Sequence, residues 1–236
     1  RQFRNDAGQN ICFWLRGVVP CTWSQPDSSP CAELSPYYIP SLQDESEDGF
    51  VRGFTDGSGG RHSSDVRVRR AGWGWVRVYG DIDAGDVSSA GVGAASYGAL
   101  PGIRQTVPRS ELRALIQVLK AYPDASELVV HCDCKPIVDW FARPTETWLA
   151  GANEDLWLEA REALGKRRGT TRVLKVAAHQ GVDSLVLGHI RPLELLGNAL
   201  ADALASRGAS EHEVQEDEIE SIVLVDSMAA RVRNRI

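Results

Sequence analysis

The sequence predicts an α/β fold with a mixed five-stranded sheet flanked by helices. Short apolar runs bounded by glycine and polar residues predict strands, and longer segments in which apolar residues recur every three to four positions predict helices. Along the chain, these segments follow the order three strands, helix, strand, helices, strand, helix. That order is typical of an α/β domain.

The first three strands are expected in the first half of the chain. One covers residues 50–56 and ends at Asp56, where a glycine-rich turn follows. A second covers residues 71–79, in which glycines between aromatic and β-branched residues allow close backbone approach. A third lies within residues 90–107.

The second half begins with a helix in which leucine and isoleucine recur at helical spacing. Ser110 is its expected N-cap, Glu111 lies in its first turn, and residues 122–123 end it. The elements expected after it are a strand at 127–132, helices at 135–141 and 153–164, a strand at 172–178, a long loop at 180–197, a helix at 198–206 and a terminal helix at 216–233, with Ile219, Ile222, Val223 and Met228 on one stripe.

A chain of 236 residues is long enough for one domain with a substantial core and extensions. We expect a loosely ordered leader or remnant of a preceding domain at residues 1–48, a catalytic domain at 49–208, and an acidic, partly helical extension at 209–236. The chain begins at Arg1 rather than Met, which we interpret as a fragment of a longer product, a processed form or an incomplete gene model.

The net charge of −6 is unevenly distributed. Residues 41–48 carry four acidic residues and residues 211–220 carry six, with no Lys or Arg in either segment. The other 22 acidic residues stand against 26 basic ones, which leaves about +4. A modestly basic remainder is compatible with phosphate contact.

The chain shows no sign of a membrane span or of a disulfide framework. No apolar run approaches the roughly 20 residues that a spanning helix needs, and no signal peptide is evident. Five cysteines, an odd number, predict reduced thiols. We therefore expect an intracellular protein, either nuclear or cytoplasmic.

Four acidic residues stand in four separate local contexts. Asp56 ends a strand in a Thr-Asp-Gly-Ser turn, and Glu111 lies at the start of a helix. Asp133 follows an apolar strand, and Asp202 lies on a later helix. Each residue alone is a weak signal, because an Asp after a strand is most often a turn residue and a Glu in a first helical turn most often a partner of the helix dipole.

The ordered set of motifs around these residues resembles the ribonuclease H family, over residues 49–208. The motifs that carry the resemblance are the Thr55-Asp56-Gly57-Ser58 turn, the Arg-Ser-Glu-Leu-Arg-Ala-Leu helix start at 109–115, the strand ending at Asp133, Val-Ala-Ala-His at 176–179, and Gly-Asn-Ala-Leu-Ala-Asp-Ala-Leu-Ala at 197–205. The resemblance implies the fold of that family and hydrolysis of the RNA strand of RNA–DNA hybrids.

The resemblance also implies a metal site made by the four acids. Phosphodiester hydrolysis is assisted by two divalent cations about 3.5–4 Å apart, and Mg²⁺ prefers oxygen ligands. Asp56 is expected to bridge two Mg²⁺ ions, for which Mn²⁺ is an alternative. Glu111 is expected to bind one ion and to help read the RNA 2′-hydroxyl, Asp133 to lie beside Asp56, and Asp202 to complete the second ion's shell.

Further residues follow from the same resemblance. Gly57 and Ser58 are expected to approach the RNA strand through their backbone groups. His179 is expected to assist protonation of the leaving group or product release, with His189 in the same loop as the alternative. Asn198 is expected to support the site as a polar residue one helical turn before Asp202.

The chain departs from the family pattern at one substrate-contacting position. Cys134 stands where the family usually has Ser, which exchanges a good hydrogen-bond donor for a weak one. A change in substrate grip is expected there without loss of metal binding.

Three functions remain open from the sequence. The first is an active hybrid nuclease, with a covalently linked reverse transcriptase domain in a retroelement polyprotein as the expected context. The second is a catalytically decayed domain of the same fold that binds nucleic acid; loss of an acid would favour it, and all four are present. The third is an integrase or other nuclease of the superfamily, against which the motif at 197–205 argues.

Overall fold

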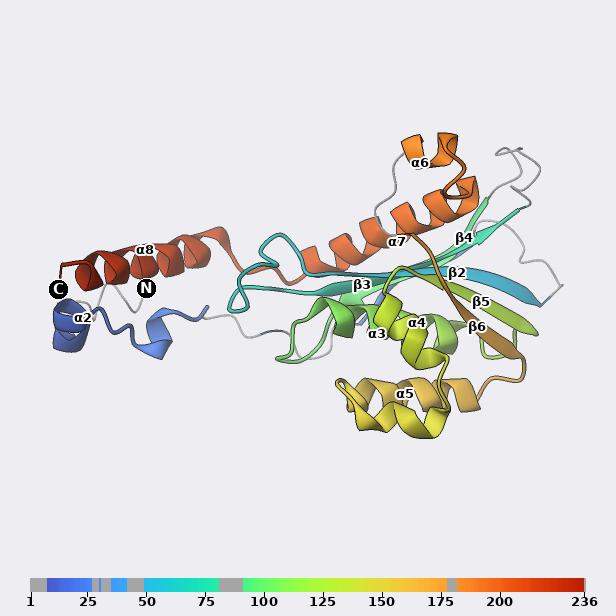
Figure 1. Ribbon diagram of the computed structural model, residues 1–236, viewed down its shortest axis with the longest axis horizontal. Helices are drawn as coiled ribbons and strands as arrows, with labels where there is room; N and C mark the ends of the chain where they lie inside the picture. Colours follow the sequence, from blue (N-terminus) through green and yellow to red (C-terminus); the bar gives the residue numbers. More distant parts are fainter. Residues whose placement is uncertain are drawn as a thin grey trace.

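A mixed six-stranded sheet forms the centre of the protein in the computed structural model, which describes residues 8–26, 30, 35–41, 49–80, 91–177 and 182–235 (Figure 1). The strands are β1 (Tyr37–Ile39), β2 (Phe50–Ser58), β3 (Gly72–Tyr79), β4 (Gly91–Ala99), β5 (Glu127–Cys132) and β6 (Thr170–Lys175). They lie in the order β1-β4-β3-β2-β5-β6. β1 to β4 pair antiparallel across the sheet, and β2, β5 and β6 run parallel. The predicted mixed α/β fold is confirmed.

The sheet has one more strand than expected. β1 pairs antiparallel with the outer edge of β4, and the ring of Tyr37 stacks on that of Tyr97 with centroids 5.0 Å apart. All three residues of β1 are exposed, so the strand carries no apolar alternation that would reveal it in the sequence. Its place in the sheet comes from this pairing and from the hydrogen bond that Ser96 Oγ donates to the Tyr37 carbonyl, at 2.8 Å.

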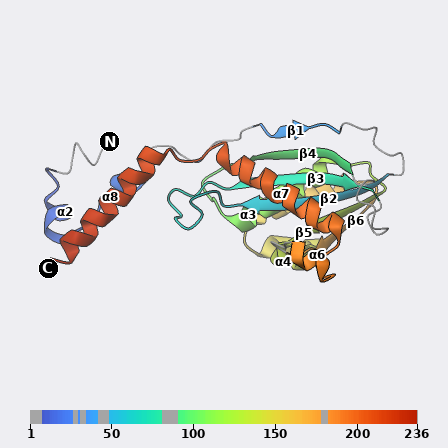
Figure 2. The ribbon, with the colours of Figure 1, turned by 90° about the horizontal axis from the view of Figure 1, so that it is seen from above.

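Helices cover both faces of the sheet. α3 (Val107–Ala121), α4 (Lys135–Phe141) and α5 (Glu154–Gly165) lie on one face, and α7 (Pro192–Ser210) lies on the other (Figures 1 and 2). Two short helices, η3 (Thr145–Ala150) and α6 (Val182–Val186), occupy connections. The core under α3 includes the predicted stripe of that helix: Leu112, Leu115, Ile116 and Leu119.

α3 begins three residues before the expected cap. Thr106 is its N-cap residue, and the prediction of Ser110 as N-cap was wrong. Pro108 explains the earlier start, because proline suits the first turn of a helix, where its missing N–H has no partner to lose. The Ser110 hydroxyl donates instead to the Val107 carbonyl, at 2.9 Å, and Glu111 lies in the second turn.

α7 also begins earlier than expected, at Pro192 rather than at Asn198. The backbone N–H of Arg191 donates to the Glu194 carboxylate at 3.2 Å, which closes the helix start without the Ser, Thr, Asp or Asn that usually marks it. The helix then crosses β3 very closely: a Cβ on Gly74 would lie 2.6 Å from the backbone nitrogen of Ala205. Glycine in the strand therefore sets the depth at which α7 packs.

A small helical unit lies beyond one end of the sheet. It consists of α2 (Ile11–Arg16), η1 (Cys21–Trp23) and α8 (Glu216–Arg233), and it is called here the α2–α8 unit (Figures 1 and 2). The residues that it buries in a cluster of its own are Phe13, Trp23, Val225 and Ala229. Val223 does not share the buried stripe of α8, contrary to expectation, and is 59% exposed. Among the described residues, no helix is long and apolar enough to cross a bilayer.

Candidate active site

Three carboxylates meet at one edge of the sheet. Asp56 lies on β2, Asp133 directly follows β5, and Glu111 reaches the same place from α3. β2 and β5 are parallel neighbours in which Thr55 pairs with Cys132, so the next residue of each strand is an aspartate. One oxygen of each of the three carboxylates lies within 4.8 Å of the others. The structure therefore brings together three of the four predicted acids.

Burial and mutual repulsion make the cluster unfavourable for negative charge. Asp56 is 5% exposed and Glu111 4%. Burial, followed by the charge of Asp133, raises the pKa of Asp56 to about 7. Burial, followed by the charge of Asp56, raises the pKa of Glu111 well above its usual value. No Lys or Arg in the described part of the chain forms an ion pair with the three acids. An all-oxygen donor set of this kind fits a hard divalent cation such as Mg²⁺ or Mn²⁺.

Close packing and hydrogen bonds hold the two buried carboxylates in place. The Gly57 backbone N–H donates to Asp56 Oδ1 at 2.8 Å. The thiol of Cys132, which is fully buried, lies with its Sγ 4.0 Å from Glu111 Oε2 and donates to it weakly. A Cβ on Gly57 would lie 2.4 Å from the Glu111 backbone nitrogen, so only glycine lets α3 approach β2 this closely.

The two predicted residues on α7 lie in different surroundings. Asp202 is exposed and lies outside the group of three, but it is close enough for its charge to contribute to the raised pKa of Asp56. Asn198 is buried at 7% exposure, and its Oδ1 has no hydrogen-bond partner in the described structure. The prediction that both residues lie on one helix is confirmed, and of the two only Asp202 is exposed.

The remaining predicted residues surround this edge of the sheet. Ser58 Oγ accepts from the Gly60 N–H at 3.2 Å, and Cys134 is half-buried at the start of α4. Burial is the main reason that the pKa of the Cys134 thiol is raised. His179 lies outside the described residues. His189 is exposed between α6 and α7, and its backbone N–H donates to the Ser184 carbonyl at 2.9 Å.

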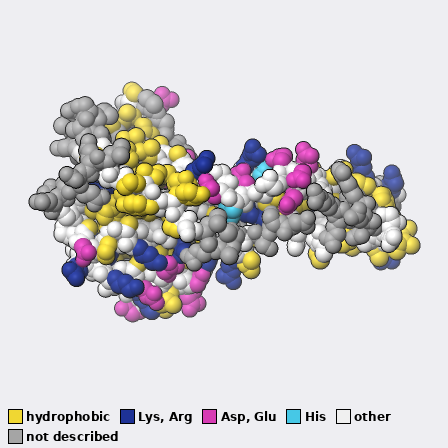
Figure 3. Space-filling model, turned by 180° about the vertical axis from the view of Figure 1, so that it is seen from behind, with side chains coloured by type: hydrophobic (Ala, Val, Ile, Leu, Met, Phe, Trp, Pro, Cys, Tyr) yellow, Lys and Arg dark blue, Asp and Glu magenta, His cyan; other side chains and the backbone are white. Residues whose placement is uncertain are grey.

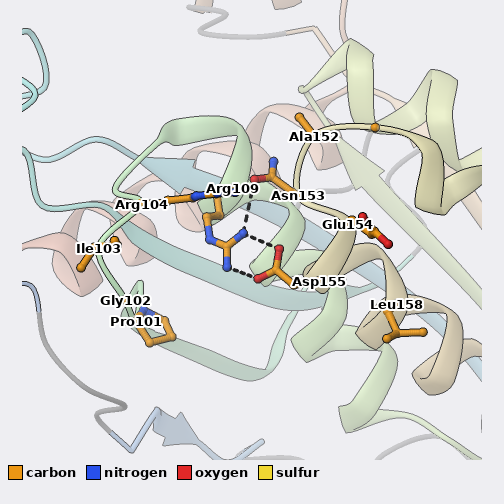
Figure 4. Close-up of a pocket in the computed structure, with 11 residues that line it drawn as sticks. Pro101, Gly102, Ile103, Arg104, Arg109, Ala152, Asn153, Glu154, Asp155 and Leu158 are labelled. Atoms are coloured by element: carbon orange, nitrogen blue, oxygen red, sulfur yellow. Dashed lines mark hydrogen bonds and ion pairs between the residues drawn. The ribbon is translucent and has the colours of Figure 1, made fainter.

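A pocket of about 710 Å³ lies beside the first turns of α3, and its charged lining residues are Arg104, Arg109, Glu154 and Asp155 (Figure 4). Its walls are the loop after β4, which carries Arg104, and the turn before α5. Arg109 spans it and binds the Asn153 side chain at 3.3 Å and Asp155 at 2.8 Å. Arg104 is exposed and forms no ion pair within the described residues. This pocket could not be predicted from the sequence, because its residues come from two loops about 50 positions apart.

The family model for RNase H matches residues 50–210, which include all four acids. The chain belongs to the ribonuclease H family. The ribonuclease H of Herminiimonas arsenicoxydans is 30% identical over 141 residues, a match that covers 59% of this chain and 84% of that protein. Family membership supports a ribonuclease, a hydrolase of phosphodiester bonds. The division of the chain at residues 48 and 208 stays a prediction.

Two solved structures share the ribonuclease H fold with this chain at low identity. The foamy viral protease–reverse transcriptase in complex with an RNA/DNA hybrid has a TM-score of 0.51 and 14% identity, over 73% of this chain and 22% of that one. The native prototype foamy virus protease–reverse transcriptase has a TM-score of 0.50 and 19% identity, over 72% and 22%. This chain thus corresponds to a small part of each.

Proposed function

We propose that the chain is a metal-dependent endonuclease that hydrolyses the RNA strand of RNA–DNA hybrids. The observation that carries the proposal is the approach of Asp56, Glu111 and Asp133 to within 4.8 Å at the edge of a ribonuclease H sheet. Buried carboxylates with raised pKa values reduce the stability of the folded protein when they are charged, and such groups cluster at functional sites. Bound divalent cations would offset this cost, because they favour the charged forms of the carboxylates.

Asp56, Glu111 and Asp133 would hold the cations, and Asp202 would complete the ligand set from α7. When bound, two such ions supply a nucleophilic hydroxide from water and neutralise charge on the leaving oxygen. The protein holds its carboxylates ready through the Gly57–Asp56 hydrogen bond and the close packing of α3 on β2. His179 would donate a proton to the leaving oxygen or help release the product.

Substrate contacts are proposed on both sides of the carboxylates. The backbone of Gly57 and Ser58 would meet the RNA strand, Glu111 would read its 2′-hydroxyl, and contact with that hydroxyl separates RNA from DNA. Cys134 would give a weaker contact than a serine, with Asn198 as polar support beneath. We further propose that Arg104 contacts a backbone phosphate, because it is exposed at the pocket beside α3 and forms no ion pair within the described residues.

A covalently linked reverse transcriptase domain forms part of the proposal for the cellular context. The two foamy virus structures support it, since each is a protease–reverse transcriptase that contains this fold. We also propose an intracellular location, nuclear or cytoplasmic, because the five cysteines of the chain predict reduced thiols.

Cleavage of an end-labelled RNA–DNA hybrid tests the proposed activity. The chain is incubated with Mg²⁺ or with EDTA, next to matched RNA and DNA duplexes. We expect metal-dependent cutting of the RNA strand of the hybrid alone, and its loss in Asp56→Asn. Asp217→Asn, an exposed aspartate of α8, is the matched control and should cut normally. A folded protein that binds the hybrid without cutting it would instead support a catalytically decayed domain.

A further inference from the structure

α2 and α8 lie side by side in the same direction and end together. Phe13 of α2 packs in one buried cluster with Ala229 of α8. One turn further on, the side chain of Arg233 donates from its Nη1 to the Gly17 carbonyl at 3.0 Å. Both helices therefore end at the part of the α2–α8 unit that lies farthest from the sheet (Figures 1 and 2). This outer end, called here the tip, comprises residues 15–18 and 231–235.

The tip and the helix leading to it expose large apolar side chains. In the tip, Leu15 is 63% and Val18 55% exposed. In the preceding turn of α2, Ile11 is 68% and Trp14 43% exposed, and only Phe13 of this helix is buried. A helix that is apolar on all sides is expected to be buried on all sides. These side chains therefore indicate a surface that a protein or a membrane covers.

The charge of the tip is entirely positive. Its four charged residues, all exposed, are Arg16, Arg231, Arg233 and Arg235. The segments 8–26 and 227–235, which form the outer half of the unit, contain no Asp or Glu. Within the described residues, none of the four arginines has an ion-pair partner. Arginine at the end of a helix interacts favourably with the last carbonyl groups, but that interaction does not explain the apolar side chains beside them.

The base of the unit carries the opposite charge and is fixed to the body of the protein. Residues 216–220 contain four acidic residues. Glu216 pairs with Arg61 at 3.2 Å and Asp226 with Arg67 at 2.7 Å, and both arginines belong to the loop between β2 and β3. Figure 3 shows acidic side chains near the base, and hydrophobic side chains with Lys and Arg at the outer end. An anionic surface would therefore attract the tip and repel the base, and would meet the unit end-on.

We propose that the tip docks the protein on the surface of an anionic lipid bilayer. Leu15, Val18 and Trp14 enter the boundary between headgroups and acyl chains, and the four arginines contact lipid phosphates. A bilayer fits the tip better than a nucleic acid does, because aliphatic side chains add nothing to phosphate contacts and only a bilayer takes up both kinds of residue. The docking holds the catalytic domain away from the membrane and is independent of the proposed nuclease activity.

Co-sedimentation of the full chain with lipid vesicles tests the docking. We expect binding to vesicles of phosphatidylcholine with phosphatidylserine, little binding to phosphatidylcholine alone, and weaker binding at high salt. Leu15→Asp combined with Val18→Asp should weaken binding at least about tenfold. Val186→Asp, which changes an apolar residue of α6 that is 80% exposed, is the matched control and should bind as the wild type does. A wild-type chain that ignores anionic vesicles, or a double variant that binds them normally, would overturn the proposal.

Charge reversal separates a lipid surface from a nucleic acid. Arg231→Glu combined with Arg235→Glu should weaken binding to anionic vesicles at least about tenfold, because each arginine near such a surface contributes about fivefold. Arg168→Glu combined with Arg172→Glu makes the same charge change near the start of β6 and should bind vesicles normally. Binding of an RNA–DNA hybrid should be the same in the tip variant as in the wild type. Loss of hybrid binding in the tip variant, with vesicle binding unchanged, would assign the tip to nucleic acid instead.

Discussion

Gly57 lies directly against the backbone of Glu111. A Cβ on Gly57 would come within 2.4 Å of the Glu111 nitrogen and 2.5 Å of Ser110 Oγ. The same glycine donates its N–H to Asp56 Oδ1 at 2.8 Å. One residue without a side chain thus fixes the position of two carboxylates, one through a hydrogen bond and one through the space it leaves for α3.

Replacing Gly57 by alanine should disable the site more than it unfolds the protein. The methyl group would push α3 away from β2 and move Glu111 out of the cluster, so we expect kcat on a hybrid substrate to fall more than about tenfold. Gly165→Ala is the control, because nothing lies within 4 Å of a Cβ at that position, and its kinetics should match the wild type. Normal kcat in Gly57→Ala would show that α3 can shift without consequence.

Asp56→Asn should stabilise the metal-free protein at neutral and higher pH. Folding raises the pKa of Asp56 from 3.8 to about 7, so the folded state binds more protons than the unfolded state between these values. The stability that protonated Asp56 contributes to the folded state is therefore fully present below about pH 4 and is lost as pH rises through 7. Asparagine avoids that loss, which is worth roughly 2–4 kcal/mol above pH 7.

Thermal unfolding in EDTA checks this prediction. The Tm of Asp56→Asn should exceed that of the wild type at pH 8, and the difference should vanish near pH 4. Mg²⁺ should raise the Tm of the wild type and leave the variant unchanged, because a ligand that binds only the folded state stabilises it. Equal Tm values at pH 8 in EDTA would show that the buried carboxylate carries no such penalty.

The sequence predicted best where a residue's role depends on its nearest neighbours in the chain. Asp56 lies near the end of β2 and Asp133 directly follows β5, so their meeting at the same end of the sheet follows from the parallel pairing of these strands. Glu111 was also found, although the helix around it begins at Val107 because proline, not serine, marks its start. The order of the motifs along the chain was sufficient to identify Glu111 as a site residue, although the predicted N-cap of its helix was wrong.

Features that depend on how elements cross were harder to predict. The position of Asp202 relative to the cluster depends on the depth of α7 on β3, which Gly74 sets through contact with Ala205. β1 is too short and too exposed to show any periodicity. Val223 was assigned to the buried stripe of α8, although the partners that decide the buried side, Phe13 and Trp23, lie some 200 residues earlier in the chain.

His179→Ala should slow turnover severalfold or more, and His189→Ala should have little effect. His189 is exposed beyond α6, whereas His179 follows soon after β6, whose neighbour β5 leads to Asp133. Single-turnover and steady-state rates on one hybrid would separate a role in chemistry from a role in product release. Loss of activity in the His189 variant alone would transfer the role to that residue.

Arg104→Ala should weaken substrate binding with little change in the chemical step. Arg104 lines the open pocket beside α3 but does not belong to the carboxylate cluster, so its charge should act on the nucleic-acid backbone. We expect KM for the hybrid to rise about threefold to tenfold, kcat to stay within about twofold, and the salt dependence of binding to fall by about one phosphate contact. Arg168→Ala is the control, because Arg168 is highly exposed and pairs with Asp124 at 3.6 Å near the start of β6, at the opposite end of the sheet. Equal effects of the two substitutions would show that the pocket adds only to general charge, whereas an effect of Arg104 alone would place the substrate backbone in it.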